Sequence, residues 1–116
     1  MHELSIADAI LDSVRAETQK RPGSHVVKVG VRIGALSGVE PEALSFGFNA
    51  LVQGTDLEPL VLEVVSVPRR QRCPLCTLNF EAPEENLACP RCGHAETELA
   101  GGDEMDVAYM EIEEQE

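Results

Sequence analysis

The chain has 116 residues, enough for one modest hydrophobic core, or for one domain with a metal-held insertion. Its formal net charge is -12, from 21 acidic and 9 basic side chains, which argues against non-specific nucleic-acid binding because such binding depends on Lys and Arg. No apolar run approaches the roughly 20 residues of a membrane span, and the first residues lack the pattern of a secretory signal. We therefore expect a cytoplasmic protein that binds neither nucleic acid nor membrane.

Helical and strand periodicities alternate over the first part of the chain. Residues 5–20 are predicted to form a helix that Ser5 caps, because four apolar residues recur at helical spacing: Ala7, Ile10, Leu11 and Val14. Strict alternation of apolar residues over 27–33 predicts a half-buried strand. A second helix is expected from Pro41 to about Gly54, with an apolar stripe of Leu44, Phe48 and Leu51. A second strand, rich in Val and Leu, is predicted at 60–67.

The last predicted strand, 106–113, is far in sequence from the other two and needs a sheet to join. We therefore predict an α+β fold, in which a small three-stranded sheet carries two helices and is interrupted by an inserted zinc-ribbon-like module. In this interpretation, 1–68 form an α/β domain that the C-terminal strand, within 103–116, completes. The zinc-binding module occupies 69–102.

Two C-P-x-C motifs, at 73–76 and 89–92, carry all four cysteines of the chain. A C-x-x-C turn directs two thiolates at one ion, so two such turns complete a tetrahedral shell of four sulfurs around Zn(II). The predicted ligands are Cys73, Cys76, Cys89 and Cys92. Four cysteines leave no open position for water or substrate, so the zinc is interpreted as structural. The stretch 77–88 between the motifs is long enough for a short hairpin.

A nucleic-acid-binding zinc ribbon is the alternative for this module taken alone. Arginines make the segment locally basic: Arg69, Arg70, Arg72 and Arg91. Only Phe80 offers a ring for base stacking, however, and the rest of the chain is acidic. We therefore expect the arginines to be solvated or paired with nearby carboxylates, namely Glu81, Glu84 and Glu85. A redox role for either C-x-x-C lacks the thioredoxin-like setting that it needs.

His2 is a candidate nickel ligand at the start of the chain. The Met1 amine, the His2 backbone nitrogen and the imidazole can chelate one metal, as can the His2 nitrogen, the Glu3 nitrogen and the imidazole. Either set suits the square-planar nitrogen sites of Ni(II) or Cu(II) and leaves a fourth position. A histidine at position 2 is often no more than an exposed side chain, so this signal alone is weak.

Together these features resemble the HypA/HybF family of hydrogenase nickel-insertion proteins, and the resemblance runs in order along nearly the whole chain. The segments that carry it are 1–6 (MHELSI), 31–34 (VRIG), 36–37 (LS), 41–44 (PEAL), the two C-P-x-C motifs, 101–105 (GGDEM) and 111–113 (EIE).

The resemblance implies a function and a set of site residues. It implies a nickel metallochaperone rather than an enzyme, with Ni(II) as transferred cargo bound by His2 and its adjoining backbone. Glu3 supports that site, Glu40 is a further carboxylate candidate, and His94 is a candidate for the fourth nickel position. The four cysteines bind structural Zn(II). The implied partners are the HypB GTPase and the hydrogenase large subunit, with urease maturation served in some organisms. A zinc-stabilised interaction domain without nickel is the remaining alternative.

Overall fold

The structure is a computed structural model that describes residues 3–82 and 86–114. By its internal contacts the chain divides into two compact units. The first unit holds Met1–Arg32, Val39–Val65 and Asp106–Glu116, and the second holds Ile33–Gly38 and Ser66–Met105. None of the helices in the described residues combines the length and the apolar character that crossing a membrane requires.

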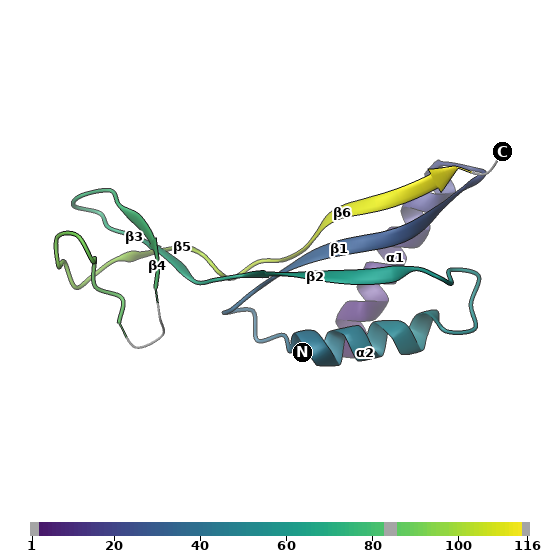
Figure 1. Ribbon diagram of the computed structural model, residues 1–116, viewed down its shortest axis with the longest axis horizontal. Coiled ribbons are helices and arrows are strands. Elements are labelled where there is room, and N and C mark those ends of the chain that lie inside the picture. Colours follow the sequence, from purple (N-terminus) through teal and green to yellow (C-terminus); the bar gives the residue numbers. More distant parts are fainter. Residues whose placement is uncertain (1–2, 83–85, 115–116) are drawn as a thin grey trace. The chain divides into compact units, whose positions relative to one another are not determined.

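Two helices belong to the first unit (Figure 1). Helix α1 (Glu3–Lys20) buries one apolar stripe: Ile6, Ala7, Ile10, Leu11 and Val14. Ser5 lies inside this helix and is exposed, so the predicted cap at Ser5 is wrong; the carboxylate of Glu3 occupies the first turn instead. Helix α2 (Pro41–Val52) begins, as predicted, at a proline, which suits a first turn because its missing N–H would have no partner there.

Helix α2 packs against the first turn of α1 at Gly47. A Cβ built on Gly47 would lie 3.7 Å from the Leu4 Cα atom and 3.4 Å from the Leu4 Cδ1 atom. Both are ordinary van der Waals distances, so the first turn of α1 packs directly against α2 at this position. At the other end of α2, the N–H of Gln53 donates to the Asn49 carbonyl, and Gly54 follows in the left-handed region at φ 80°.

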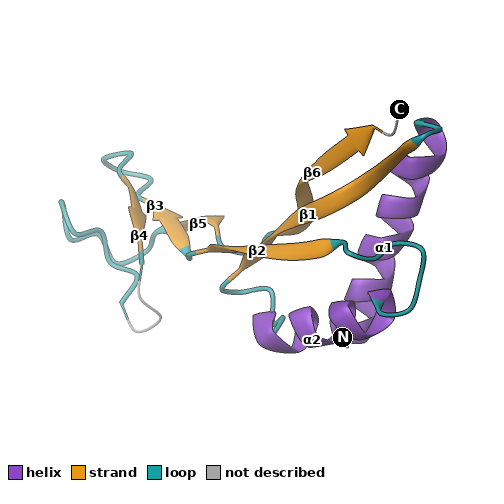
Figure 2. Ribbon diagram, turned by 45° about the vertical axis from the view of Figure 1, so that its right-hand side comes forward, coloured by secondary structure: helices purple, strands orange, loops and turns teal. Residues whose placement is uncertain are grey.

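Three strands form one sheet in the order β2-β1-β6, which Figure 2 shows beside the two helices. Strand β1 (Ser24–Gly34) occupies the centre, with β2 (Val61–Val67) and β6 (Met105–Glu114) as its neighbours. Alternate β1 residues, Val29, Val31 and Ile33, are at most 4 % exposed. The predicted α+β class with a three-stranded sheet and two helices is confirmed. The helices bury apolar residues at helical spacing, and the central strand buries alternate ones.

A second sheet, in the second unit, was not predicted from the sequence. It has the order β4-β3-β5 and contains β3 (Arg70–Arg72), β4 (Asn79–Glu81) and β5 (Glu98–Gly101). Both neighbours pair with β3 in antiparallel fashion, with Gln71 opposite Phe80 on one side and Leu99 on the other. The stretch 77–88, long enough for a short hairpin, contributes β4 among its described residues, and β4 pairs with the strand that precedes the first cysteine.

Candidate metal centre

The four cysteines of the second unit converge on one point. Their sulfur atoms all lie within 4.8 Å of one another, and two cross-motif pairs, Cys73 with Cys92 and Cys76 with Cys89, are 3.5 Å apart. A tetrahedral zinc site with Zn–S bonds of about 2.3 Å would place its sulfurs roughly 3.8 Å apart. The donor set and its spacing therefore fit a four-coordinate thiolate metal site. Zinc held there would supply folding energy for the module.

Two equivalent backbone turns bring the sulfurs together. In the first, Cys73 N–H donates to the Leu78 carbonyl, and Thr77 N–H donates to the Cys73 carbonyl, both at 2.9 Å. In the second, Cys89 N–H donates to the His94 carbonyl and Gly93 N–H donates to the Cys89 carbonyl, again both at 2.9 Å. Because the same two backbone hydrogen bonds form in both motifs, each C-P-x-C turn presents two of the four sulfurs in the same way.

The residue after each motif has positive φ, because the chain must turn away from the sulfurs there. Gly93 has φ 80° and Thr77 has φ 65°. Glycine adopts this region without cost, whereas a β-branched residue does so only under constraint. In both turns a backbone N–H also approaches the first cysteine sulfur at 3.5 Å, from Cys76 to Cys73 and from Cys92 to Cys89.

Nearby hydrogen-bond donors change the pKa values of the cysteine thiols. The backbone amide of Leu78, and next the guanidinium of Arg91, lower the pKa of Cys76 to about 6. The backbone amide of Cys92 lowers the pKa of Cys89. The backbone amide of His94 acts to lower the pKa of Cys92. The hydrogen bond with the Cys73 thiol and the partial loss of solvent outweigh this effect and raise the pKa of Cys92 to about 11. Two of the four sulfurs, one from each motif, are thus favoured as thiolates, the form that binds metal.

A buried polar network supports the cluster from β3. The Gln71 side chain is 1 % exposed; its Nε2 donates to Thr97 Oγ1 at 3.0 Å, and its Oε1 accepts from Arg69 Nε at 3.2 Å. Thr97 Oγ1 in turn donates to the Leu87 carbonyl, two residues before the second motif. The network ties the strand before the first motif to the segment before the second. Sequence reasoning missed Gln71, because nothing in Arg70-Gln71-Arg72 distinguishes a buried amide from an exposed one.

The arginines of the module make local contacts. Arg70 Nη1 lies 3.7 Å from Glu81, and Arg91 Nη2 donates to the Cys76 carbonyl at 2.7 Å. The Arg70–Glu81 contact agrees with the expected pairing to a carboxylate, whereas Glu84 and Glu85 lie outside the described residues. Phe80, the ring considered for base stacking, is half-buried on β4. Sequence reasoning did not foresee the role of Arg91, which fixes one turn against the other.

The candidate nickel residues lie at the start of the first unit. Met1 and His2 lie outside the described residues. Glu3 is half-buried, and its Oε2 accepts a hydrogen bond from the Glu40 backbone N–H at 3.1 Å. Glu40 precedes α2 in an extended conformation with an exposed side chain. The structure thus brings Glu3 and Glu40 together. His94 belongs to the second unit, where its carbonyl closes the second cysteine turn.

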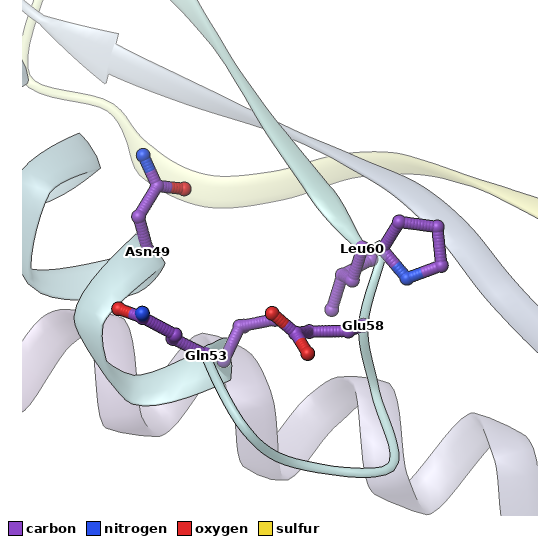
Figure 3. A pocket seen from close by; sticks show the side chains of 6 residues that line it. Asn49, Gln53, Glu58 and Leu60 are labelled. Carbon is purple, nitrogen blue, oxygen red and sulfur yellow. The ribbon is translucent and has the colours of Figure 1, made fainter.

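A pocket of about 310 Å³ lies between the end of α2 and the loop before β2 (Figure 3). Its lining residues are Asn49, Val52, Gln53, Glu58, Pro59 and Leu60. This lining supplies one carboxylate and two amides, with neither a nucleophile nor a base beside one, so the pocket offers no catalytic constellation.

Comparison with known proteins gives one consistent result. Residues 1–112 match the family model described as hydrogenase/urease nickel incorporation, metallochaperone, HypA. Proteins named hydrogenase maturation factor HypA from Methylocella silvestris and from Dechloromonas aromatica are each 38 % identical to the chain over 113 residues. In both cases the match covers 97 % of this chain and all of the relative.

Two solution structures share the fold. One is described as the Ni metallochaperone HypA from Helicobacter pylori; it is 19 % identical, covers 96 % of this chain and 97 % of its own, and has a TM-score of 0.64. Another, described as HypA protein, is also 19 % identical, covers 96 % of this chain and 95 % of its own, and has a TM-score of 0.70. At this identity the likeness concerns the arrangement of the backbone.

Proposed function

The chain belongs to the HypA family of nickel metallochaperones for hydrogenase maturation, as the sequence resemblance predicted, and on this premise we propose that its first residues bind Ni(II) and deliver it to the hydrogenase large subunit. As a member of that family it is a maturation factor and not an enzyme. The proposal has three parts: where nickel binds, what the cysteines hold, and which proteins the chain meets.

The hydrogen bond between Glu3 and the Glu40 backbone is the observation that carries the nickel site. It joins Glu3, the residue that follows His2 in sequence, to the residue that precedes α2. His2, its backbone and the imidazole supply the chelate, with Glu3 as its support. Glu40 is a nearby carboxylate, and either Glu40 or His94 would fill the fourth position. An incomplete shell suits cargo, because acceptor ligands replace the donors one at a time.

The cysteine cluster supports a division of labour between two metals. Four thiolates of Cys73, Cys76, Cys89 and Cys92 would enclose Zn(II) and leave it no exchangeable position, so zinc is scaffold and not cargo. Soft thiolate donors also differ from the nitrogen donors that suit square-planar nickel. The cargo metal therefore belongs at the chain's beginning.

The proposed partners follow from the family and from the direction of transfer. Nickel would pass to the hydrogenase large subunit alongside the GTPase HypB, in the cytoplasm, where the four cysteines remain reduced. The same nickel delivery would also serve urease maturation in organisms that have this enzyme, because the description of the family model covers both enzymes.

Nickel titration of the untagged protein, compared with His2→Ala, tests the proposal. Loss of a residue that only supports a metal ligand weakens metal affinity by about 10- to 100-fold. Because His2 is proposed to be a ligand itself, we expect the substitution to weaken nickel binding by at least that much. Isothermal titration calorimetry measures the affinity, and elemental analysis checks that zinc content is unchanged.

His25→Ala is the matched control, because His25 is a half-exposed histidine on β1 whose Nε2 lies 3.5 Å from Glu113. It should leave nickel binding intact. Equal nickel binding by the His2→Ala protein and the wild type would remove the proposed function and favour a zinc-stabilised interaction domain.

A further inference from the structure

Two large apolar side chains are exposed on the helices of the first unit, one in the first turn of α1 and one in the middle of α2. Phe46 on α2 is 78 % exposed and Leu4 on α1 is 54 % exposed. Leu4 lies against Gly47, the residue next to Phe46 in α2, which brings the first turn of α1 beside the segment that carries Phe46. Ala43 and Ala50, one turn before and after Phe46, are also exposed and extend it. We call Leu4, Ala43, Phe46 and Ala50 the N-terminal apolar patch.

The charges around this patch have a single sign. From Glu3 to Val14, and throughout α2, every charged side chain is acidic. Asp8 follows Leu4 by one turn, and Glu42 precedes Phe46 by one turn; both are exposed. An apolar centre with a charged rim is the usual composition of a protein–protein contact. The acidic rim selects a partner surface with Lys or Arg around an apolar pocket, and it opposes pairing with a second copy of the chain.

We propose that the N-terminal apolar patch is the docking surface for the protein that accepts nickel, with Phe46 as its anchor. This inference rests on the proposed function. Transfer by ligand exchange requires acceptor ligands to come within bonding distance of His2, and two residues of chain span at most about 7 Å. A partner that covers Leu4 therefore brings its own ligands within reach of the cargo. A basic rim on the acceptor would also attract this acidic end over a distance.

The inference is tested with the purified, nickel-free large-subunit precursor as the probe. Its affinity for the chaperone, with and without nickel, is measured by calorimetry, and nickel transfer is followed after mixing. Phe46→Ser should weaken the complex by about 10-fold or more, as expected for an aromatic anchor, and slow transfer in proportion. Glu42→Lys should slow association, with an effect that shrinks as salt is raised.

Leu75→Ser is the matched control, since Leu75 is 69 % exposed but lies in the first cysteine motif. It should leave acceptor affinity unchanged. Nickel affinity in the absence of the precursor should be the same in all three variants, so that loss of transfer reports docking alone.

Acceptor binding by the Phe46→Ser protein within twofold of the wild type would overturn the inference. So would a change confined to self-association in sedimentation, or to binding of the GTPase. The proposed function fails separately, if nickel binding does not depend on His2. Because acceptor affinity is also measured without nickel, the patch is judged in either case.

Discussion

The two units of this chain are held together in different ways. The first buries a continuous apolar set contributed by both helices and β1, in which Val14, Val29, Leu44 and Phe48 are completely inaccessible. The second has few buried side chains among its described residues: Ile33, Gln71, Cys73, Ala82 and Cys89. Two of these five are cysteines of the metal cluster. The contrast teaches that apolar burial stabilises the first unit, whereas the metal ion proposed for the four cysteines would supply most of the stability of the second.

Removal of the zinc proposed for the cysteine cluster should have the largest effect and should distinguish the two units most clearly. A strong chelator, or Cys73→Ala, withdraws metal-binding free energy on the order of 10 kcal/mol from the second unit. We expect hydrogen-exchange protection to disappear from β3, β4 and β5 but to persist in α2 and β1. Simultaneous loss of protection in both units would show that they fold as one, and would contradict the comparison.

A core substitution in the first unit should have the next largest effect, and this effect should be on the stability of the first unit and not of the second. Phe48→Ala removes a ring that is 0 % exposed and should lower the free energy of unfolding by about 3–5 kcal/mol. Urea denaturation followed by helical circular dichroism measures this loss, and zinc content should not change. Phe46→Ala, on the same helix but 78 % exposed, should cost less than about 0.5 kcal/mol. Similar costs for the two variants would refute the assigned core.

The smallest expected effects concern the residues after the two cysteine motifs. A Cβ on Gly93 would meet no atom within 4 Å, so Gly93→Ala tests backbone conformation alone and should weaken zinc binding by about 1–2 kcal/mol. Thr77→Gly relieves the equivalent strain at φ 65° and should strengthen it by less than about 1 kcal/mol. Competition with a chromophoric chelator measures both. Changes of the same sign would show that the two turns are not equivalent.

The sequence predicted the long elements of the fold and missed the short ones. Both helices and the three strands of the main sheet show periodicity over seven or more residues. Strands β3, β4 and β5 have three or four residues, too few for alternation to be recognised. They form because β3 pairs on both sides, which is a tertiary effect. Ser5 was misjudged as a cap because Glu3, two residues earlier, already begins the helix.

The candidate site residues also fall into those that a local sequence pattern predicts and those that it does not. The cysteine quartet follows from motif spacing alone, since each C-P-x-C motif fixes its own turn. The contact between Glu3 and Glu40 joins residues far apart in sequence, and no local pattern indicates it. The positive φ of Thr77 was equally hidden, because threonine is not a residue that predicts such a turn.

The register between β3 and β5, which places Arg70 opposite Gly101, also affects the sheet of the first unit. Strand β6 can join β1 only after the chain has closed a loop through residues 68–104. If the proposed zinc assembles the second sheet first, most of that loop is already closed, and the free-energy cost of the conformational entropy still to be lost falls by about 1–2 kcal/mol. In this proposal zinc binding lowers the entropic cost of pairing β6 with β1, because it shortens the part of the chain that is still free to move.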